Sequence, residues 1–250
     1  MPSDTTAPTD QPICLITGAS RGLGNALAHG FAKAGYHIIA VARTVGALEA
    51  LDDELKAAAA EQGGAEAAKK AGATLVPLDI RDGDAIDRLG GALHQRFGKL
   101  DVVISNAATM EVLSPVAQSA PKPFEDAWRT NCQGPYRLIR SLDPLLRQSA
   151  RGGCFIGVTC ASAIERKPFW GTYGASKAAF EAMVLSYAAE LADDPLRVNL
   201  VDPGPMATRL RTLAFPGEKE GAQPDPATKV DAFIELASAD DKRHGERIVL

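Results

Sequence analysis

Short apolar runs rich in β-branched residues alternate with amphipathic helical stretches along nearly the whole chain. Such runs are typical of strands buried on both faces, and helical connections between them let consecutive strands lie parallel. The pattern predicts an α/β fold, a doubly wound parallel sheet of about seven strands flanked by helices. The predicted strands are residues 13–17, 36–42, 74–78, 100–105, 154–159, 197–201 and 247–250, and helices are expected to begin near Gly22, Val45, Gly83, Pro123, Thr172 and Pro226.

No linker or break in composition interrupts this alternation, so we expect residues 12–250 to form a single domain. A chain of 250 residues that is 46% hydrophobic and 23% charged can bury one large core. Residues 1–11 are rich in Pro, Thr and Asp and lack the basic and apolar regions of a signal peptide, so we expect a disordered arm. The Ala-rich stretch 57–72 is expected to be an exposed helix end followed by a loose connection.

Charge and residue spacing argue against several classes of partner. The net charge of −4 is spread over interspersed acids and bases, so binding to nucleic acid or to a membrane is not expected. There is no run of about 18 apolar residues. We therefore expect a cytoplasmic protein with reduced thiols and no metal. The residues considered as metal ligands, which lack suitable spacing, are Cys14, Cys132, Cys154, Cys160, His29, His37, His94 and His244.

A glycine-rich turn follows the first predicted strand and opens the first predicted helix. At such a place backbone N–H groups and the helix dipole converge on a pyrophosphate. Three glycines alone are weak evidence, because turns collect glycine for steric reasons. Their position after a strand is what favours phosphate binding. The candidate residues of this turn are Thr17, Gly18, Ser20, Arg21, Gly22, Leu23 and Gly24.

The order T-G-x-x-x-G-x-G resembles the fingerprint of the short-chain dehydrogenases/reductases, and further marks of that family follow along residues 13–250. The resemblance implies a Rossmann fold that binds a nicotinamide dinucleotide at strand ends. Ala108 departs from the glycine that is usual there, and a positive φ at that position would strain the loop. The implied further cofactor-binding residues are Asp79, Ile80, Asn106, Ala107, Ala108, Pro203, Gly204, Met206 and Thr208.

The end of the second predicted strand indicates which dinucleotide is bound. Enzymes that prefer NAD place an acid there for the ribose hydroxyls, whereas this chain has Ala42 followed by Arg43 and Thr44. Arg43 and Arg21 can each offer a guanidinium to a 2′-phosphate. The alternative is that both are solvated surface arginines. The missing acid and the two bases favour NADP(H).

Tyr173 and Lys177 form a Y-x-x-x-K pair on one face of a predicted helix. Such a pair alone is usually an accidental surface neighbourhood, but the resemblance implies that Tyr173 transfers a proton. Lys177 and an oxidised nicotinamide would both favour its phenolate. Both residues are also expected to contact the cofactor.

The resemblance implies two more site residues, an asparagine that holds a relay water and a serine that bonds the substrate oxygen. Asn131 matches the first, whereas the serine position holds Cys160. A thiol is a weak donor. Three alternatives remain: Thr159 or Ser162 supplies the hydroxyl from a shifted loop, Cys160 itself serves weakly, or catalysis has lapsed.

The stretch 211–216 and the segment up to Pro226 are expected to form a small substrate lid, because the resemblance extends to oxidoreductases that share R-x-x-A-F-P. Apolar residues on either side of it are candidates for a substrate pocket, and core packing explains some of them equally well. These residues are Phe169, Trp170, Met206, Leu210, Leu213 and Phe215.

The sequence thus predicts an NADP(H)-dependent oxidoreductase that interconverts a carbonyl and an alcohol on a small, apolar substrate by hydride transfer. The alternative is a non-catalytic NADP(H)-binding regulatory or sensor protein, which is suggested by Cys160 at the position of the family serine. The resemblance also implies a homodimer or homotetramer. Because relatives continue beyond the residue that matches Leu250 into a D-G-G segment used in tetramers, the choice between the two stays open.

Overall fold

Seven parallel strands form one sheet in the order β3-β2-β1-β4-β5-β6-β7, which confirms the predicted fold class. The computed structural model describes residues 11–250 without the side chains of residues 69 and 70. The predicted arm over residues 1–11 therefore lies, except for its last residue, outside the described part. The strands are β1 (Ile13–Thr17), β2 (His37–Ala42), β3 (Ala73–Pro77), β4 (Val102–Ser105), β5 (Cys154–Val158), β6 (Arg197–Asp202) and β7 (Arg247–Val249).

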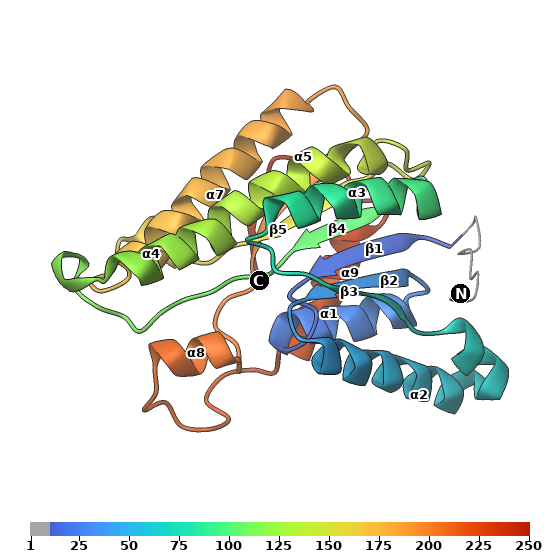
Figure 1. Cartoon of the computed structure of the whole chain (residues 1–250), viewed down its shortest axis with the longest axis horizontal. Coiled ribbons are helices and arrows are strands. Elements are labelled where there is room, and N and C mark those ends of the chain that lie inside the picture. Colours follow the sequence, from blue (N-terminus) through green and yellow to red (C-terminus); the bar gives the residue numbers. More distant parts are fainter. Residues whose placement is uncertain (1–10) are drawn as a thin grey trace.

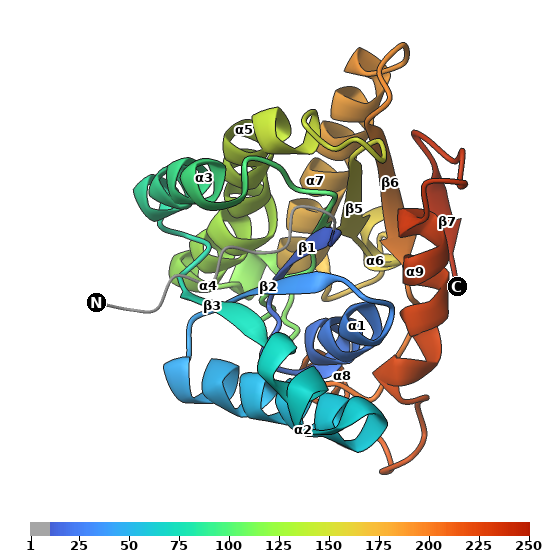
Figure 2. The ribbon, with the colours of Figure 1, turned by 90° about the vertical axis from the view of Figure 1, so that its right-hand side faces the viewer.

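Helices cover both faces of the sheet (Figures 1 and 2). Consecutive strand residues point to opposite faces, so Leu15 enters the core under one layer and Ile16 the core under the other. The first layer holds α3 (Gly83–Phe97), α4 (Pro121–Trp128), α5 (Gly134–Leu146) and α7 (Gly171–Glu190). The second holds α1 (Gly22–Lys33), α2 (Val45–Lys70) and α9 (Val230–Ala237).

Strand order reverses direction between β1 and β4, which are neighbours in the sheet. At such a switch point the connections leave to opposite sides, and a crevice opens beyond the carboxyl ends of the strands. The ends of β1, β4, β5 and β6 therefore place the glycine turn and the Tyr173 helix at one edge of the sheet.

Several short elements have no counterpart in the sequence prediction. These are η1 (Val116–Gln118), a π-helix η2 (Arg129–Gln133) between α4 and α5, α6 (Ser162–Glu165) and α8 (Arg209–Ala214). The helix expected at Pro226 begins as a 3₁₀ turn, η3 (Pro226–Lys229), that leads into α9. Figure 1 shows α8 standing apart from the layers, on the side where α4 begins.

The stretch 57–72 differs from its prediction, because most of it is helical. Helix α2 continues to Lys70, with non-helical backbone at Gly64, where φ is 72°. Ala, Glu and Lys are strong helix formers, and one glycine with positive φ interrupts such a helix without ending it. No helix of the described residues is long and apolar enough to cross a membrane.

Candidate active site

The glycine turn is closely packed where β1 meets α1. Gly18 and Gly22 have φ of 69° and 54°, a region that favours glycine. A Cβ on Gly24 would lie 2.2 Å from the carbonyl oxygen of Gly18. These glycines are therefore required by backbone geometry, as the interpretation of a tight turn predicts.

Thr17 and Asn106 hold this turn against the end of β4. The Thr17 Oγ1 accepts the N–H groups of Asn106 and Ala107, both at 3.0 Å. The Asn106 Nδ2 donates to the carbonyl oxygen of Thr17 at 2.9 Å. Ala108 is not among the described non-glycine residues with positive φ, which are Arg166 and Phe169, so the strain considered for it does not arise.

The amino end of α1 has features of an anion site. Arg21 occupies the N-cap position without a side-chain bond to the helix, so its first N–H groups have no side-chain cap. The Thr208 Cγ2 would lie 3.4 Å from a Cβ on Gly22. The turn that starts at Pro203 and Gly204 thus brings Thr208 beside the glycine turn. The uncapped end of α1 fits the pyrophosphate of a dinucleotide, and the turn that carries Thr208 fits its nicotinamide end.

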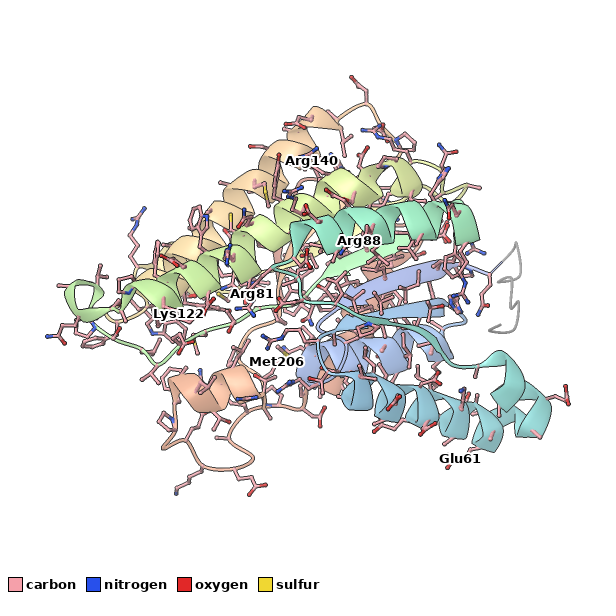
Figure 3. All side chains as sticks on the ribbon, in the orientation of Figure 1. Glu61, Arg81, Arg88, Lys122, Arg140 and Met206 are labelled. Carbon is pink, nitrogen blue, oxygen red and sulfur yellow. The ribbon has the colours of Figure 1, made fainter. Side chains whose placement is uncertain are left out.

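Thr208 is itself the N-cap of α8, with its Oγ1 accepting the N–H of Arg211 at 3.3 Å. Met206 is partly buried against the core beneath α1 and α9, so the packing alternative applies to it. In Figure 3 the side chain of Met206 lies close to α8.

An exposed basic residue, Arg43, follows β2 and is itself followed by an exposed hydroxyl residue, Thr44. Asp79, an acid that the resemblance implies to bind the cofactor, pairs with Arg81 at 2.7 Å, and Arg81 also contacts Asp126 of α4 at 3.0 Å. The hydrogen bonds from Arg81 lower the pKa of Asp79, and the charge of Arg43 lowers it further. Figure 3 shows Arg81 beside α4.

Tyr173 and Lys177 are both buried, with 8% and 3% of their surface exposed. The Lys177 Nζ donates to the carbonyl oxygen of Val158, the last residue of β5, at 2.8 Å. Burial lowers the pKa of Lys177. The pair is therefore no accidental surface neighbourhood.

The protein alone keeps the Tyr173 phenol neutral. Burial raises its pKa, and Cys160 and Asp202 raise it further. This direction is opposite to the expected preference for a phenolate, because desolvation penalises the charged form. A neutral phenol is suited to giving a proton to a carbonyl oxygen.

The three candidates for the missing serine have different surroundings. Thr159 is 3% exposed, and its hydroxyl donates to the Glu181 Oε1 at 2.6 Å, so its one O–H donor is already engaged. The half-buried Cys160 has its Sγ 2.8 Å from the Ser162 Oγ, and it lies near enough to Tyr173 to raise the pKa of the phenol. Cys160 and Ser162 therefore remain the candidates beside the phenol.

Asn131 lies in the π-helix, a local distortion that is frequent at functional sites. Its Oδ1 accepts the N–H of Thr109, and its Nδ2 donates to the carbonyl of the same residue, both at 2.8 Å. A further donation reaches the Ser176 Oγ at 3.0 Å. The side chain thus joins the loop after β4 to α7, a role the sequence did not indicate.

Aromatic rings connect the lid to the start of α7. The centroid of the Trp170 ring lies 6.0 Å from that of Tyr173 and 6.1 Å from that of Phe215. Arg211 lies over the Phe215 ring at 3.8 Å and pairs with Glu218 at 2.6 Å. Trp170 and Phe215 therefore meet near the phenol.

Other members of the predicted apolar set have no ring contact with this group among the described residues. Phe169, with φ of 73°, is 54% exposed, and Leu213 is 36% exposed. Leu210 is half-buried.

The sequence interpretation missed Glu181, which is 7% exposed below the site. Its place four residues after Lys177, on the same helix face, is a signal that helical periodicity offers.

Comparisons with known proteins agree with this geometry. The sequence model of the short chain dehydrogenase family matches residues 12–219. An uncharacterized oxidoreductase of Escherichia coli K12 is 28% identical over 233 residues, which cover 92% of this chain and 88% of the relative.

Two crystal structures share the fold. A short chain dehydrogenase from Shigella flexneri 2a, complexed with NADP, has a TM-score of 0.87 at 26% identity and covers 98% of this chain and 99% of its own. Another, from Escherichia coli CFT073 and complexed with NADPH, has a TM-score of 0.86 at 26% identity, with 97% and 99% covered. The chain therefore belongs to the short-chain dehydrogenase family and is an oxidoreductase.

Proposed function

We propose that this protein is an NADP(H)-dependent oxidoreductase that interconverts a carbonyl and an alcohol on a small, apolar substrate. The observation that carries the proposal is the group formed by the buried Tyr173 and Lys177 and the half-buried Cys160 thiol, beyond the end of β5. This group brings a proton donor, an ammonium and a hydrogen-bond donor together where a reacting oxygen must lie.

The glycine turn and the uncapped end of α1 would hold the pyrophosphate. Arg43 and Arg21, both exposed beside this turn, would bind the 2′-phosphate that distinguishes NADP from NAD. Arg81 supports this selection, because it occupies the Asp79 carboxylate and leaves the guanidinium of Arg43 available. The complexes of the two solved relatives with NADP and NADPH favour the same cofactor.

Tyr173 would give its proton to the substrate oxygen in reduction and take it back in oxidation. Its raised pKa favours the neutral donor. Lys177 keeps two N–H donors beyond the one given to Val158, and these would reach the ribose of the nicotinamide. The bound nicotinamide supplies or accepts the hydride at its C4.

Cys160 or Ser162 would orient the substrate oxygen. The Cys160 Sγ and the Ser162 Oγ are hydrogen-bonded to each other, and either of them can be the donor. One of the two groups could therefore donate to a substrate oxygen while it accepts a hydrogen bond from the other. The Trp170 and Phe215 rings would cover the apolar part of the substrate. Asn131, through its backbone or its second lone pair, would hold the relay water.

Residues 12–250 would act as one domain in the cytoplasm. Self-association into a homodimer or homotetramer is supported by large apolar side chains exposed on α4 and α5. These are Phe124, Trp128 and Tyr136.

Fluorescence titration of NADPH and NADH tests the cofactor part of the proposal. We expect NADPH to bind at least about tenfold more tightly, because one charge-assisted pair is worth roughly 1.5–3 kcal/mol. The variant Arg43→Ala should lose most of this preference. Arg88→Ala, an exposed arginine of α3, is the matched control and should keep it. Tighter binding of NADH by the wild type would contradict the assignment.

A further inference from the structure

A set of charged side chains that the proposed chemistry does not use lies beneath the site. Arg247 of β7 donates from its Nε to the Glu181 Oε1 and from its Nη2 to the Asp202 Oδ2, each at 3.0 Å. Glu181 and Asp202 are 7% and 4% exposed. Two carboxylates this deeply buried need a cation between them, and Arg247 is that cation.

Each carboxylate also holds one turn of the site. The Glu181 Oε1 accepts the hydroxyl of Thr159, the residue before Cys160, at 2.6 Å. The Asp202 Oδ1 accepts the N–H of Gly204, whose φ is 70°, at 3.0 Å. One guanidinium therefore links the turn that carries the thiol to the turn that leads to Thr208.

The same carboxylates act on the proton-transfer pair. Glu181 lies one helical turn after Lys177 and raises its pKa against the effect of burial, and Asp202 raises the pKa of Tyr173. Removal of Arg247 would leave both carboxylates without their shared cation. Both the placement of the two carboxylates and their effect on the pKa values of Tyr173 and Lys177 therefore depend on Arg247 of the last strand.

We propose that Arg247 is a positioning residue, which sets the spacing between the Cys160 turn and the Gly204 turn through Glu181 and Asp202. The proposal rests on the proposed function for what the two turns hold, a substrate oxygen and a nicotinamide. Arg247 touches neither, because its partners are the two carboxylates.

The test uses two measurements that need no substrate. One is the Kd for NADPH by fluorescence, and the other is the rate at which iodoacetamide alkylates Cys160, followed by peptide mass spectrometry. Arg247→Met should raise the Kd about tenfold, the loss expected when roughly one charge-assisted hydrogen bond's worth of positioning is removed, and should change the alkylation rate measurably, because both turns lose their common anchor. Arg247→Lys, which keeps the charge, should restore part of both.

Arg243→Met is the matched control. Arg243 lies four residues earlier and pairs with Glu235 and Asp241 outside the site, so its loss should leave both measurements unchanged within error. The proposal is overturned if folded Arg247→Met gives the same Kd and alkylation rate as this control. A purely structural role would lower the thermal stability and leave these two readouts alone.

Thr159→Val provides a second test if Arg247→Met does not fold. This change removes only the bond from Thr159 to Glu181, so we expect an altered alkylation rate of Cys160 with an unchanged Kd for NADPH. An unaltered alkylation rate would also overturn the proposal. If the wild type reduces no carbonyl, the proposed function fails, while the alkylation measurements still judge the role of Arg247.

Discussion

Asn131→Ala should destabilise the protein strongly, because the amide is 1% exposed and makes three hydrogen bonds. A hydrogen bond contributes about 1 kcal/mol net, so the three contribute roughly 3 kcal/mol. The N–H and carbonyl of the half-buried Thr109 would also be left unpaired, which adds a penalty at the low end of the range, about 1 kcal/mol. We expect the free energy of unfolding to fall by about 4 kcal/mol and Tm by roughly 10 °C.

Urea unfolding followed by tryptophan fluorescence measures this loss, with calorimetry for Tm. Asn25→Ala is the control, because Asn25 is a half-buried residue of α1 whose amide reaches Glu54 only at 3.5 Å. The control should change stability by less than about 0.5 kcal/mol. A loss below about 1 kcal/mol for Asn131→Ala would refute the reasoning that these bonds join the β4 loop to α7.

Three further predictions concern the site itself. Gly24→Ala should abolish NADPH binding in a fluorescence titration, because its Cβ would clash with backbone, whereas Gly91→Ala, with open space in α3, should stabilise the protein by about 1 kcal/mol. Carbonyl reduction should stay level through neutral pH and fall only above about pH 10, since the raised pKa of Tyr173 keeps its phenol protonated below that point; a fall near pH 8 would contradict this. Cys160→Ser should raise kcat if the thiol orients the substrate, whereas a loss only with Ser162→Ala would assign that role to the hydroxyl.

The five central strands were predictable because they are short runs buried on both faces, whereas the edge strands β3 and β7 are only partly buried. The observed strand ends differ from the predicted ones by no more than two residues. The glycine turn was predictable for a different reason. Gly18 and Gly22 take positive φ, and a side chain on Gly24 would meet backbone, so local geometry demands these residues.

The remaining features depend on contacts between distant parts of the chain. Thr159 meets Glu181 across 22 positions and Arg247 meets Glu181 across 66, and neither pair leaves a local pattern. The prediction that a loose connection follows the helix end within residues 57–72 was too long, and this was a local error: α2 continues to Lys70 because strong helix formers outweighed one glycine. The pKa of Tyr173 depends on how deeply the fold buries it, which the Y-x-x-x-K spacing does not specify.

Steady-state oxidation of NADPH over a panel of small apolar aldehydes and ketones tests the central claim most directly. Wild type should reduce at least one of them. Tyr173→Phe should lose about 10²-fold or more in kcat with an unchanged Kd for NADPH, as expected for a general acid. Tyr136→Phe, an exposed tyrosine of α5, should keep full activity. Turnover that survives Tyr173→Phe undiminished would contradict the account.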